Sequence, residues 1–284
     1  MISIIVPAYN AAHTIGEQLT ALAEQNYTET WELLVCDNGS TDNTLAECRR
    51  FASRIPHLKI VDASATRGSA HARNVGARQA KYEKLAFCDA DDVVDTGWVA
   101  AVSKALDQFD FIASKFELSR LNPGPIDRKM EQQFGLQPYD YPKFLPHAGG
   151  CGLGIKKSLH EKIGGFDETM RWLEDTDYCW RAQLSGHELH FADSAVIHIR
   201  LRKTKSSNFR QAFRWGEYNV YLYKKYRSKG MQELTLSQGI NQWRRLFKQW
   251  RSFIRTRQRR IWLRSFYWRL GRIYGSLKYR VSAI

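Results

Sequence analysis

The chain has 284 residues, 43% of them hydrophobic, so it can bury one large α/β core and still leave a sizeable appendage. Its five cysteines are odd in number, lie far apart and form no CxxC pair. This argues against a disulfide framework or a zinc site and favours a reducing compartment. The first residues lack the basic lead and apolar length of a secretory signal, and no stretch approaches the roughly 18 apolar residues of a membrane-spanning helix.

The net charge of +14 is unevenly distributed along the chain. From Arg200 to the end there are 23 Lys and Arg residues against two acids, whereas residues 1–199 hold 20 basic and 27 acidic residues. A mildly acidic part therefore precedes a very basic part. We expect two regions with different tasks, 1–203 and 204–284.

Residues 1–95 alternate short apolar runs with helix-forming segments. The expected strands are 3–6, 32–35, 58–61 and 85–88, and the expected helices are 14–25, 41–53 and 70–81. This alternation predicts βαβ units and a mostly parallel, Rossmann-like sheet with flanking helices. Because such sheets bind ligands at the carboxyl ends of their strands, the loops that begin at Pro7, Asp37, Thr66 and Asp89 should form the site.

The pattern changes after Asp95. Residues 121–146 hold five of the seven prolines, which predicts an irregular loop of the kind that forms lids or recognition segments. The other expected elements are a helix at 98–106, a strand at 109–114, a glycine-dense turn at 149–154, a short helix that ends at 163, a helix at 174–185 and a last strand at 195–199.

Asp89 and Asp91 stand on either side of Ala90, directly after an apolar strand. Carboxylates two residues apart at a strand end can face the same side and share one hard cation, with phosphate oxygens completing its shell. The alternative is that these acids cap the helix that follows. The sequence thus indicates a cation site that needs support from other motifs.

Five motifs supply that support along residues 1–200. They are SIIVPAYN at 3–10, VCDNGSTD at 35–42, RGSAHARNVG at 67–76, DAD at 89–91 and ED at 174–175. In this order and at these spacings, the series resembles the family 2 glycosyltransferases, which have the GT-A fold. The resemblance implies a catalytic domain over residues 1–203 that takes a sugar from a metal-bound nucleotide-sugar and inverts its anomeric centre.

The resemblance also implies roles in nucleotide-sugar binding. Pro7 and Tyr9 would hold a flat nucleobase, and Asp37 would accept a hydrogen bond from a base N–H or a ribose hydroxyl. Amides near Gly68 would favour anionic oxygen, and Arg73 would reach the base or the diphosphate. The alternative for Arg73 is a solvated residue on a helix surface.

One position departs from the family pattern. Many relatives carry two adjacent acids where this chain has Asp37 and Asn38. Asparagine accepts a hydrogen bond but brings no charge, so the identity of the base stays open. Uracil is the default, with thymine and guanine as alternatives.

The resemblance assigns the cation and its ligands as well. Asp89, Ala90 and Asp91 would contact the donor diphosphate, and Asp89 and Asp91 would hold Mn²⁺ or Mg²⁺. His198 matches a position where many GT-A enzymes place a third metal ligand. Its alternative is a structural histidine beside a strand.

The catalytic base is expected in the ED motif. An inverting displacement requires a carboxylate on the face opposite the leaving diphosphate, and the resemblance implies Asp175 as that base, with Glu174 positioning the acceptor or the base. The alternative is that both acids cap a helix. The glycines of the turn at 149–154 either admit the donor sugar or form a tight packing turn.

The basic region should be helical from residue 206 onward. Apolar residues recur at steps of three and four in two stripes, with four arginines at 255–260 between them. The first stripe is Ile240, Trp243, Phe247, Trp250 and Ile254, and the second is Trp262, Phe266, Leu270, Tyr274 and Leu277. Such helices are typical of anionic membrane surfaces. One alternative is that a stripe packs on the catalytic domain. Nucleic acid is not expected as a partner, because no recognised nucleic-acid-binding motif accompanies the charge.

Together these features predict transfer of a sugar, with a UDP-sugar favoured, to a hydroxyl of a glycan or lipid-linked acceptor. The implied process is cell-surface polysaccharide or glycolipid synthesis by an enzyme that is peripheral on the cytoplasmic face of a membrane. Two alternatives remain open, a nucleotidyltransferase and a non-catalytic protein that binds nucleotide-sugars or membranes.

Overall fold

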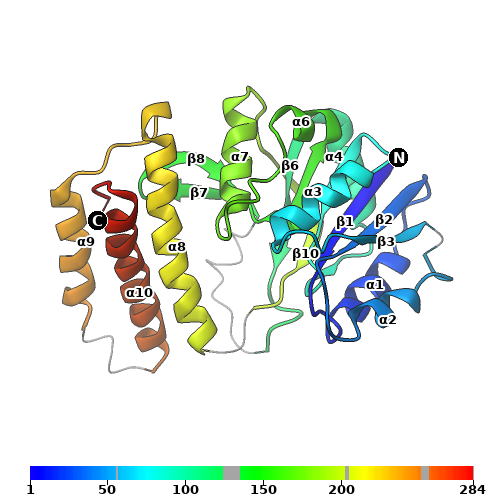
Figure 1. The fold of residues 1–284 in the computed structure, drawn as a ribbon, viewed down its shortest axis with the longest axis horizontal. Helices are drawn as coiled ribbons and strands as arrows, with labels where there is room; N and C mark the ends of the chain where they lie inside the picture. The colour runs from blue at the N-terminus through cyan, green and yellow to red at the C-terminus, as the bar shows by residue number, and fades with distance from the viewer. Residues whose placement is uncertain (56, 124–134, 202–204, 251–255, 284) are drawn as a thin grey trace. The chain divides into compact units, whose positions relative to one another are not determined.

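The computed structural model describes residues 1–55, 57–123, 135–201, 205–250 and 256–283 (Figure 1). The chain forms two compact units. Unit 1 comprises Met1–Gln137 and Pro146–Leu201, and unit 2 comprises Pro138–Leu145 and Arg202–Ile284. Unit 2 therefore includes the short segment Pro138–Leu145, which is separated in sequence from the rest of that unit.

Unit 1 is built on one eight-stranded sheet. Its strands are β1 (Ile2–Ala8), β2 (Trp31–Asp37), β3 (Leu58–Asp62), β4 (Lys84–Phe87), β5 (Val93–Val94), β6 (Phe111–Glu117), β9 (Leu153–Lys156) and β10 (His190–His198). Their order is β3-β2-β1-β4-β9-β6-β10-β5. The first four are parallel, β9 runs antiparallel to β4 and β6, and β10 is parallel to β6. The expected α/β fold with a mostly parallel sheet is confirmed.

Helices cover both faces of this sheet. They are α1 (Ile15–Ala23), α2 (Thr44–Arg49), α3 (Ser69–Gln79), α4 (Trp98–Gln108), α6 (Lys157–Lys162) and α7 (Glu174–Leu184). Alternate residues of β1 point to opposite faces, so Ile4 joins a core with Leu19 of α1 and Val102 of α4. On the other face, a Cβ on Gly76 of α3 would lie 2.5 Å from the Ile5 side chain. This close approach fixes α3 against the sheet, and its first turn lies beside the loop that follows β2.

Two segments differ from the sequence expectation. Within 121–146, β7 (Gln137–Asp140) and β8 (Lys143–His147) pair with each other, although an irregular loop was expected; residues 124–134 lie outside the described residues. The glycine-dense turn forms the 3₁₀ helix η1 (Gly150–Gly152) and continues into β9, a strand that was not expected. This strand has only four residues and follows three glycines, and its Gly154 packs directly on Ile112 of β6.

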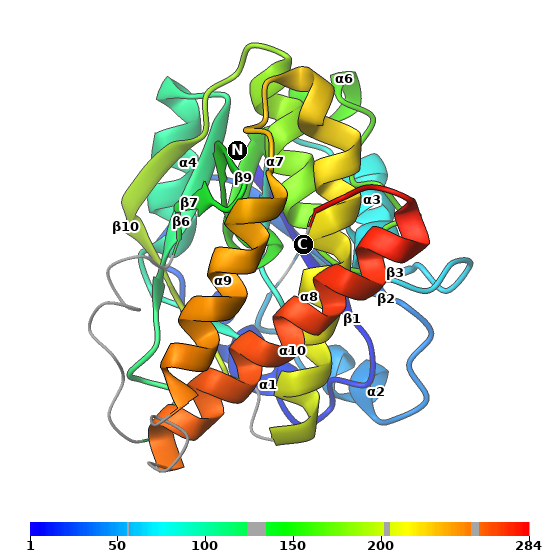
Figure 2. The same ribbon diagram turned by 90° about the vertical axis from the view of Figure 1, so that its left-hand side faces the viewer.

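Unit 2 is helical, as expected of the basic region (Figure 2). Its elements are α8 (Lys205–Tyr226), the 3₁₀ turn η2 (Arg227–Lys229), α9 (Leu236–Lys248) and α10 (Thr256–Tyr279). Gly230, with φ of 92°, follows η2, and a capping box between Thr235 and Gln238 begins α9. No helix in the described part of the chain is long and apolar enough to cross a membrane.

Helices α8 and α10 touch through their backbones. A Cβ on Gly216 would lie 1.9 Å from the carbonyl oxygen of Trp268, and one on Gly271 would lie 1.9 Å from that of Phe213. No side chain fits at either position. Beside this crossing, the fully buried Glu217 accepts hydrogen bonds from cationic side chains of both helices.

The segment Pro138–Leu145 packs on these helices. Asn219 of α8 donates a hydrogen bond to the hydroxyl of Tyr139. The backbone of Lys143 makes two hydrogen bonds to Gln232, at 3.0 and 3.1 Å. These contacts explain why the segment belongs to unit 2 although it is flanked in sequence by unit 1.

Candidate active site

The loops after β1, β2 and β3 meet at one edge of the sheet of unit 1. Ala8 lies opposite Asp37, and Asp37 lies opposite Asp62, at the ends of the three parallel strands. Half-buried Pro7 lies one position earlier, opposite Cys36. The structure therefore brings the first two motifs to the same edge.

Tyr9 and Asp37 differ in exposure at this edge. The ring of Tyr9 is 43% exposed, its hydroxyl accepts a hydrogen bond from Arg67, and the Arg67 guanidinium lies 4.5 Å above the ring centroid. Asp37 is buried, and both its carboxylate oxygens accept from the backbone N–H of Ser40, at 3.3 and 3.2 Å. Tyr9 offers a face for a flat ring, whereas Asp37 shapes the loop beside it.

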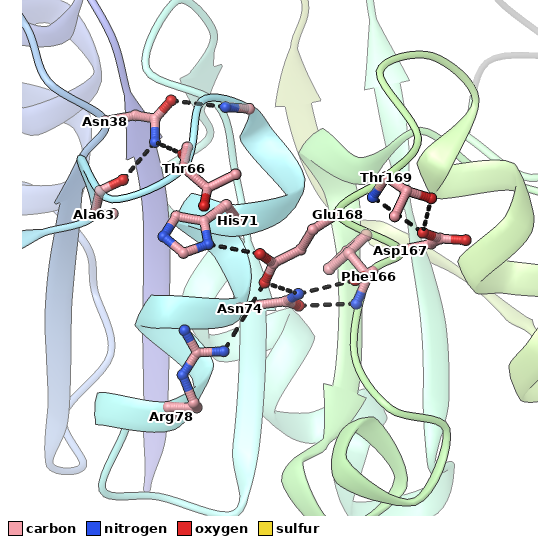
Figure 3. A network of polar contacts seen from close by, with 11 residues as sticks. Asn38, Ala63, Thr66, His71, Asn74, Arg78, Phe166, Asp167, Glu168 and Thr169 are labelled. Atoms are coloured by element: carbon pink, nitrogen blue, oxygen red, sulfur yellow. Dashed lines mark hydrogen bonds and ion pairs between the residues drawn. The ribbon is translucent and has the colours of Figure 1, made fainter.

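Asn38 holds a neighbouring loop in place (Figure 3). Its amide nitrogen donates to the carbonyl oxygens of Ala63 and Thr66, at 2.5 and 2.8 Å, and its amide oxygen accepts from the backbone N–H of Gly68 at 2.8 Å. An aspartate cannot donate to either carbonyl. The departure from the family pattern at this position thus has a structural reason.

Gly68 begins α3 with φ of 142°, a conformation that favours glycine. No other atom lies within 4 Å of the position that a Cβ would occupy there. The backbone is therefore open at this point. The next residue, Ser69, donates from its hydroxyl to a carboxylate oxygen of Glu174 at 2.9 Å.

Arg73 joins the two acidic motifs. Its side chain is only 4% exposed, one Nη donates to Asp89 at 2.7 Å, and the other lies 3.5 Å from Glu174. The guanidinium also lies over the ring of Phe166 and against the backbone of Gly150. Burial by itself lowers the pKa of Arg73, but the charges of the two carboxylates outweigh it and raise that pKa. Arg73 is therefore not the solvated surface residue of the alternative reading.

Asp175 lies next to this cluster. One of its oxygens accepts from the backbone N–H of Gly150 at 3.2 Å, and the other accepts from that of Thr176 at 2.7 Å. Burial raises the pKa of Asp175 above its ordinary value, although Arg73 and these two N–H groups act against that shift. Burial, followed by the charge of Asp175, likewise raises the pKa of Glu174.

The residue before these acids carries backbone strain. Leu173, the N-cap of α7, has φ of 57°, in the left-handed region that non-glycine residues rarely occupy. Such a conformation typically costs about 1–3 kcal/mol and persists only where the surroundings enforce it. It sets the direction in which Glu174 and Asp175 leave the loop.

Three acids gather after β4. Asp89 is partly exposed, Asp91 is exposed, and Asp92 is only 4% exposed; Ala90 between them belongs to the core. Burial, and then the charges of Asp89 and Asp91, raise the pKa of Asp92 well above its ordinary value. Within the described ranges, Asp89, Asp92 and Cys151 place ligand atoms within 4.8 Å of one another.

This donor set fits a hard divalent cation. Burial raises the pKa of the Cys151 thiol, so that near neutral pH the carboxylates are the ligands in the set. Carboxylate oxygens are what Mn²⁺ and Mg²⁺ prefer, and Arg73 offsets only part of the negative charge. The sequence singled out Asp89 and Asp91; of these, Asp89 belongs to the group, whereas the exposed Asp91 does not. The sequence missed Asp92, the next residue.

His198 points to a different set of acids. Its Nδ1 lies 2.5 Å from Glu117, and its Nε2 lies 3.5 Å from Asp95. It does not belong to the group of potential ligands around Asp89 in the described chain. Arg200, two residues further on, does reach the acidic loop, because its backbone N–H donates to Asp92 at 2.8 Å. The role of His198 as a metal ligand stays a prediction.

A second polar network holds the loop that leads toward Asp175 (Figure 3). The side-chain amide of Asn74 both donates to and accepts from the backbone of Phe166, at 2.9 and 2.8 Å, and donates to Glu168 at 2.8 Å. His71 contacts Glu168 through Nδ1 at 2.7 Å. Because the ring of Phe166 supports Arg73, Asn74 acts on the acidic cluster through that ring.

The glycines of the turn at 149–154 serve packing. A Cβ on Gly150, Gly152 or Gly154 would collide with Arg73, Phe116 or Ile112 respectively, and Gly149 also lies close to Phe116. The sequence left this alternative open. The sequence gave no sign of Asn74 or Arg200 as contributors, since an amide or an arginine on a helix or loop is ordinarily solvated.

The comparisons with known proteins agree with this geometry. The chain matches the sequence model of the family described as "Glycosyl transferase family 2" over residues 3–164. It is 29% identical over 215 residues to the UDP-Glc:alpha-D-GlcNAc-diphosphoundecaprenol beta-1,3-glucosyltransferase WfgD of Escherichia coli, which covers 73% of this chain and 79% of that protein. It is 26% identical over 230 residues to the poly-beta-1,6-N-acetyl-D-glucosamine synthase of Staphylococcus epidermidis, which covers 76% of this chain and 54% of that protein.

Among solved structures, the chain resembles the mannosyltransferase PcManGT from Pyrobaculum calidifontis in complex with GDP-Man and Mn²⁺. The TM-score is 0.72 at 20% sequence identity, over 98% of this chain and 87% of that chain. At this identity the likeness establishes the fold alone. The expected GT-A fold is confirmed.

Proposed function

Because the chain belongs to glycosyl transferase family 2, we propose that it moves a sugar from a nucleoside-diphosphate sugar to an acceptor hydroxyl with inversion at the anomeric carbon. The expectation of a glycosyltransferase is confirmed at the level of the family. We place the catalytic domain in residues 1–203.

The observation that carries this proposal is the position of Arg73 between Asp89 and Glu174. In the proposed reaction, the carboxylate of Asp175 takes the proton of the acceptor hydroxyl while its oxygen attacks the anomeric carbon. The bond from that carbon to the diphosphate oxygen breaks, and the electron pair leaves with the nucleoside diphosphate. Arg73 holds the donor side and the acceptor side of the site together.

A divalent cation, Mn²⁺ or Mg²⁺, held by Asp89 and Asp91 with Asp92 nearby, would neutralise charge on the leaving diphosphate. Burial, and then the charges of Asp89 and Asp91, raise the pKa of Asp92, and a cation held here would offset that negative charge. On the donor, Tyr9 and Pro7 would contact the base, Asp37 the base or ribose, and Gly68 the diphosphate.

A UDP-sugar donor and a lipid-linked or glycan acceptor are the specific form that we favour. The name of WfgD, the 29% identical relative, states a UDP-glucose donor and a diphosphoundecaprenol-linked acceptor. We therefore propose a role in cell-surface polysaccharide or glycolipid synthesis.

The acceptor chemistry suggests where the enzyme works. We propose that residues 204–284 attach the enzyme peripherally to the anionic cytoplasmic face of a membrane. The support is the charge of this region, 23 Lys and Arg residues against two acids from Arg200 onward, together with its exposed apolar side chains. Because the chain belongs to glycosyl transferase family 2, we no longer consider a nucleotidyltransferase as an alternative.

Asp175→Asn tests the proposal. With Mn²⁺ present, the wild-type chain should slowly hydrolyse its preferred nucleotide-sugar and release nucleoside diphosphate. The variant should lose about 10²- to 10⁴-fold in kcat with donor affinity nearly unchanged, because the amide keeps the shape but takes no proton. Initial rates across a panel of nucleotide-sugars, with donor affinity from calorimetry, check this.

The pH profile of kcat provides a second readout. Only the ionised carboxylate accepts a proton, so activity should fall as pH falls through the pKa of Asp175. Because burial raises that pKa, the acid limb should lie above the ordinary value of 3.8. Asp193→Asn, which changes an exposed carboxylate on β10, is the matched control. Full activity in Asp175→Asn together with loss in Glu174→Gln would move the base by one residue, and full activity in both would refute the mechanism.

A further inference from the structure

Two arginines of α10, the buried Arg272 and the half-buried Arg269, have no anionic partner among the described residues. Arg272 is 2% exposed, and its Nε and one Nη have no hydrogen-bond partner; its other Nη donates to the carbonyl oxygen of Ala283. The two Nη atoms of Arg269 donate to the carbonyl oxygen of Ser265 and to Gln242, but its Nε and the hydroxyl of Tyr141 are likewise buried and unpartnered. Unpaired buried polar atoms are rare in folded proteins, and four of them in one place point to a missing ligand.

The surroundings of Arg272 are aromatic. Its guanidinium lies 4.8 Å from the ring centroid of Tyr141 and 4.9 Å from that of Trp268. Burial lowers the pKa of Arg272 to about 10, so that it keeps its charge at neutral pH. The buried acid of unit 2, Glu217, pairs with Arg214 and Lys278 instead. Residues 234–284 contain no Asp or Glu.

These unpartnered groups line a recess beside an apolar groove. The recess is narrow, about 10 Å³, which is room for one water molecule or one oxygen atom of a ligand. Trp243 of α9 lines both the recess and an open groove of about 570 Å³ along α9. Ile240, Phe247, Arg244 and Lys248 complete the groove.

The groove exposes an unusual amount of apolar surface. Ile240 and Phe247 are 50% and 54% exposed, and Trp250 just beyond the helix is 60% exposed. A continuous apolar patch rimmed by basic side chains is typical of a binding surface. Within the groove, Trp243 and Phe247 also contact Phe266 and Trp262 of α10, with ring centroids 5.9 and 6.5 Å apart, so the patch begins where α9 packs on α10 and continues along α9. Helices α9 and α10 can be followed in Figure 2.

We propose that the recess and groove bind an anionic lipid, with its phosphate on Arg269 and Arg272 and its apolar part along α9. The two features are joined at Trp243, and one molecule with both a phosphate and a hydrocarbon chain satisfies both. Free phosphate would leave the groove uncovered, and a polynucleotide has no apolar chain to fill it. The inference rests on the proposed membrane attachment and names its lipid-binding element, but it does not depend on glycosyl transfer.

The second apolar stripe of the sequence takes a different role. Trp262 donates from its indole N–H to the carbonyl oxygen of Leu246 in α9, and the ring of Phe266 stands edge-on to that of Trp243 at 5.9 Å. These side chains hold α10 to α9. The two stripes therefore meet where α10 packs on α9, and the members that line the groove, Ile240 and Phe247, provide the lipid contact.

The test is co-sedimentation of the full-length chain with phosphatidylcholine vesicles, with and without phosphatidylglycerol. Arg269→Gln should weaken binding to the anionic vesicles about 10- to 100-fold, because it removes both a charge and charge-assisted hydrogen bonds to phosphate. Arg260→Gln removes the same charge from an exposed position of α10 and should weaken binding no more than about fivefold. Equal losses in the two variants would mean non-specific attraction and would overturn the site.

Two further arms separate the sources of binding. Phe247→Ser should weaken binding several-fold even at high salt, whereas Phe191→Ser, an exposed aromatic of β10, should not. Inorganic phosphate should compete poorly; full displacement of the vesicles by it at matched phosphate concentration would mean a free-anion site and would overturn the lipid assignment. Thermal melting of each variant confirms that it folds. Donor hydrolysis by the wild-type chain is measured separately, so that a failure of the transferase proposal and a failure of this one remain distinguishable.

Discussion

The buried arginines of the two units lie in opposite surroundings. Arg73 of unit 1 contacts Asp89 and Glu174, and these carboxylates raise its pKa against the effect of burial. Arg272 of unit 2 lies among aromatic rings without a carboxylate partner in the described chain, and burial lowers its pKa. A buried charge has to be balanced, by the protein itself or by what it binds. The surplus charge at each place therefore predicts the sign of its ligand, a cation beside Arg73 and an anion beside Arg272.

The comparison predicts unequal effects when each arginine becomes methionine. Arg73→Met leaves buried carboxylates unpaired and should lower the free energy of unfolding by about 3–5 kcal/mol. Arg272→Met removes an uncompensated cation and leaves an apolar side chain among aromatic rings, so the loss should stay below about 2 kcal/mol. Urea denaturation of both variants without divalent cations measures the difference. Equal losses would show that Arg272 is balanced within the protein.

The excess of acids around Arg73 predicts metal-dependent donor binding. Asp91→Ala should weaken the Mn²⁺-dependent affinity for nucleoside diphosphate about 10- to 100-fold, because it removes a hard oxygen ligand. Asp89→Ala should act less strongly, since Asp89 is already engaged by Arg73. Titration calorimetry with and without Mn²⁺ measures both effects, with Asp193→Ala as the control. Unchanged metal-dependent affinity in both variants would refute the cation site.

The smallest effect should come from the network that supports Arg73 indirectly. Asn74→Asp keeps the shape of the side chain but places a carboxylate against the carbonyl of Phe166 and against Glu168. We expect kcat to fall about tenfold, a change of about 1.4 kcal/mol, with donor affinity maintained. Arg78→Ala, at an exposed residue 4.0 Å from Glu168, should change neither. Loss of affinity and turnover together would mean that Asn74 supports the fold in general and does not position the acids.

Much of the fold could be predicted because parallel sheets have a simple rule. Apolar strands that end at Pro7, Asp37 and Asp89 have to bring those residues toward one edge, and the order of the motifs indicated the family. Strand β9 was missed because its two apolar residues, Leu153 and Ile155, lie in a four-residue strand within a glycine-rich segment that is typical of a turn.

The site was less predictable than the fold. Nothing local distinguishes Arg73 from a solvated helix arginine, because its carboxylate partners lie 16 and 101 residues away along the chain. The two apolar stripes of the basic region also look alike in sequence. Only the tertiary contacts show that the stripes meet through the rings of Trp243 and Phe266, whereas Ile240 and Leu277 stay exposed. Which apolar residues pack and which stay exposed depends on tertiary contacts, and the periodicity of a sequence does not predict those contacts.

The inserted segment Pro138–Leu145 has a consequence for protein engineering. A truncation after residue 201 looks like removal of a whole unit, but it separates Tyr139 from Asn219 and Lys143 from Gln232. The shortened fragment would carry a hairpin whose inner side has become solvent-facing, a common cause of poor solubility. A clean excision needs two cuts, one after residue 201 and one that replaces residues 138–145 with a short polar link. With both cuts made, glycosyl transfer by unit 1 can be measured without the lipid-binding residues of unit 2.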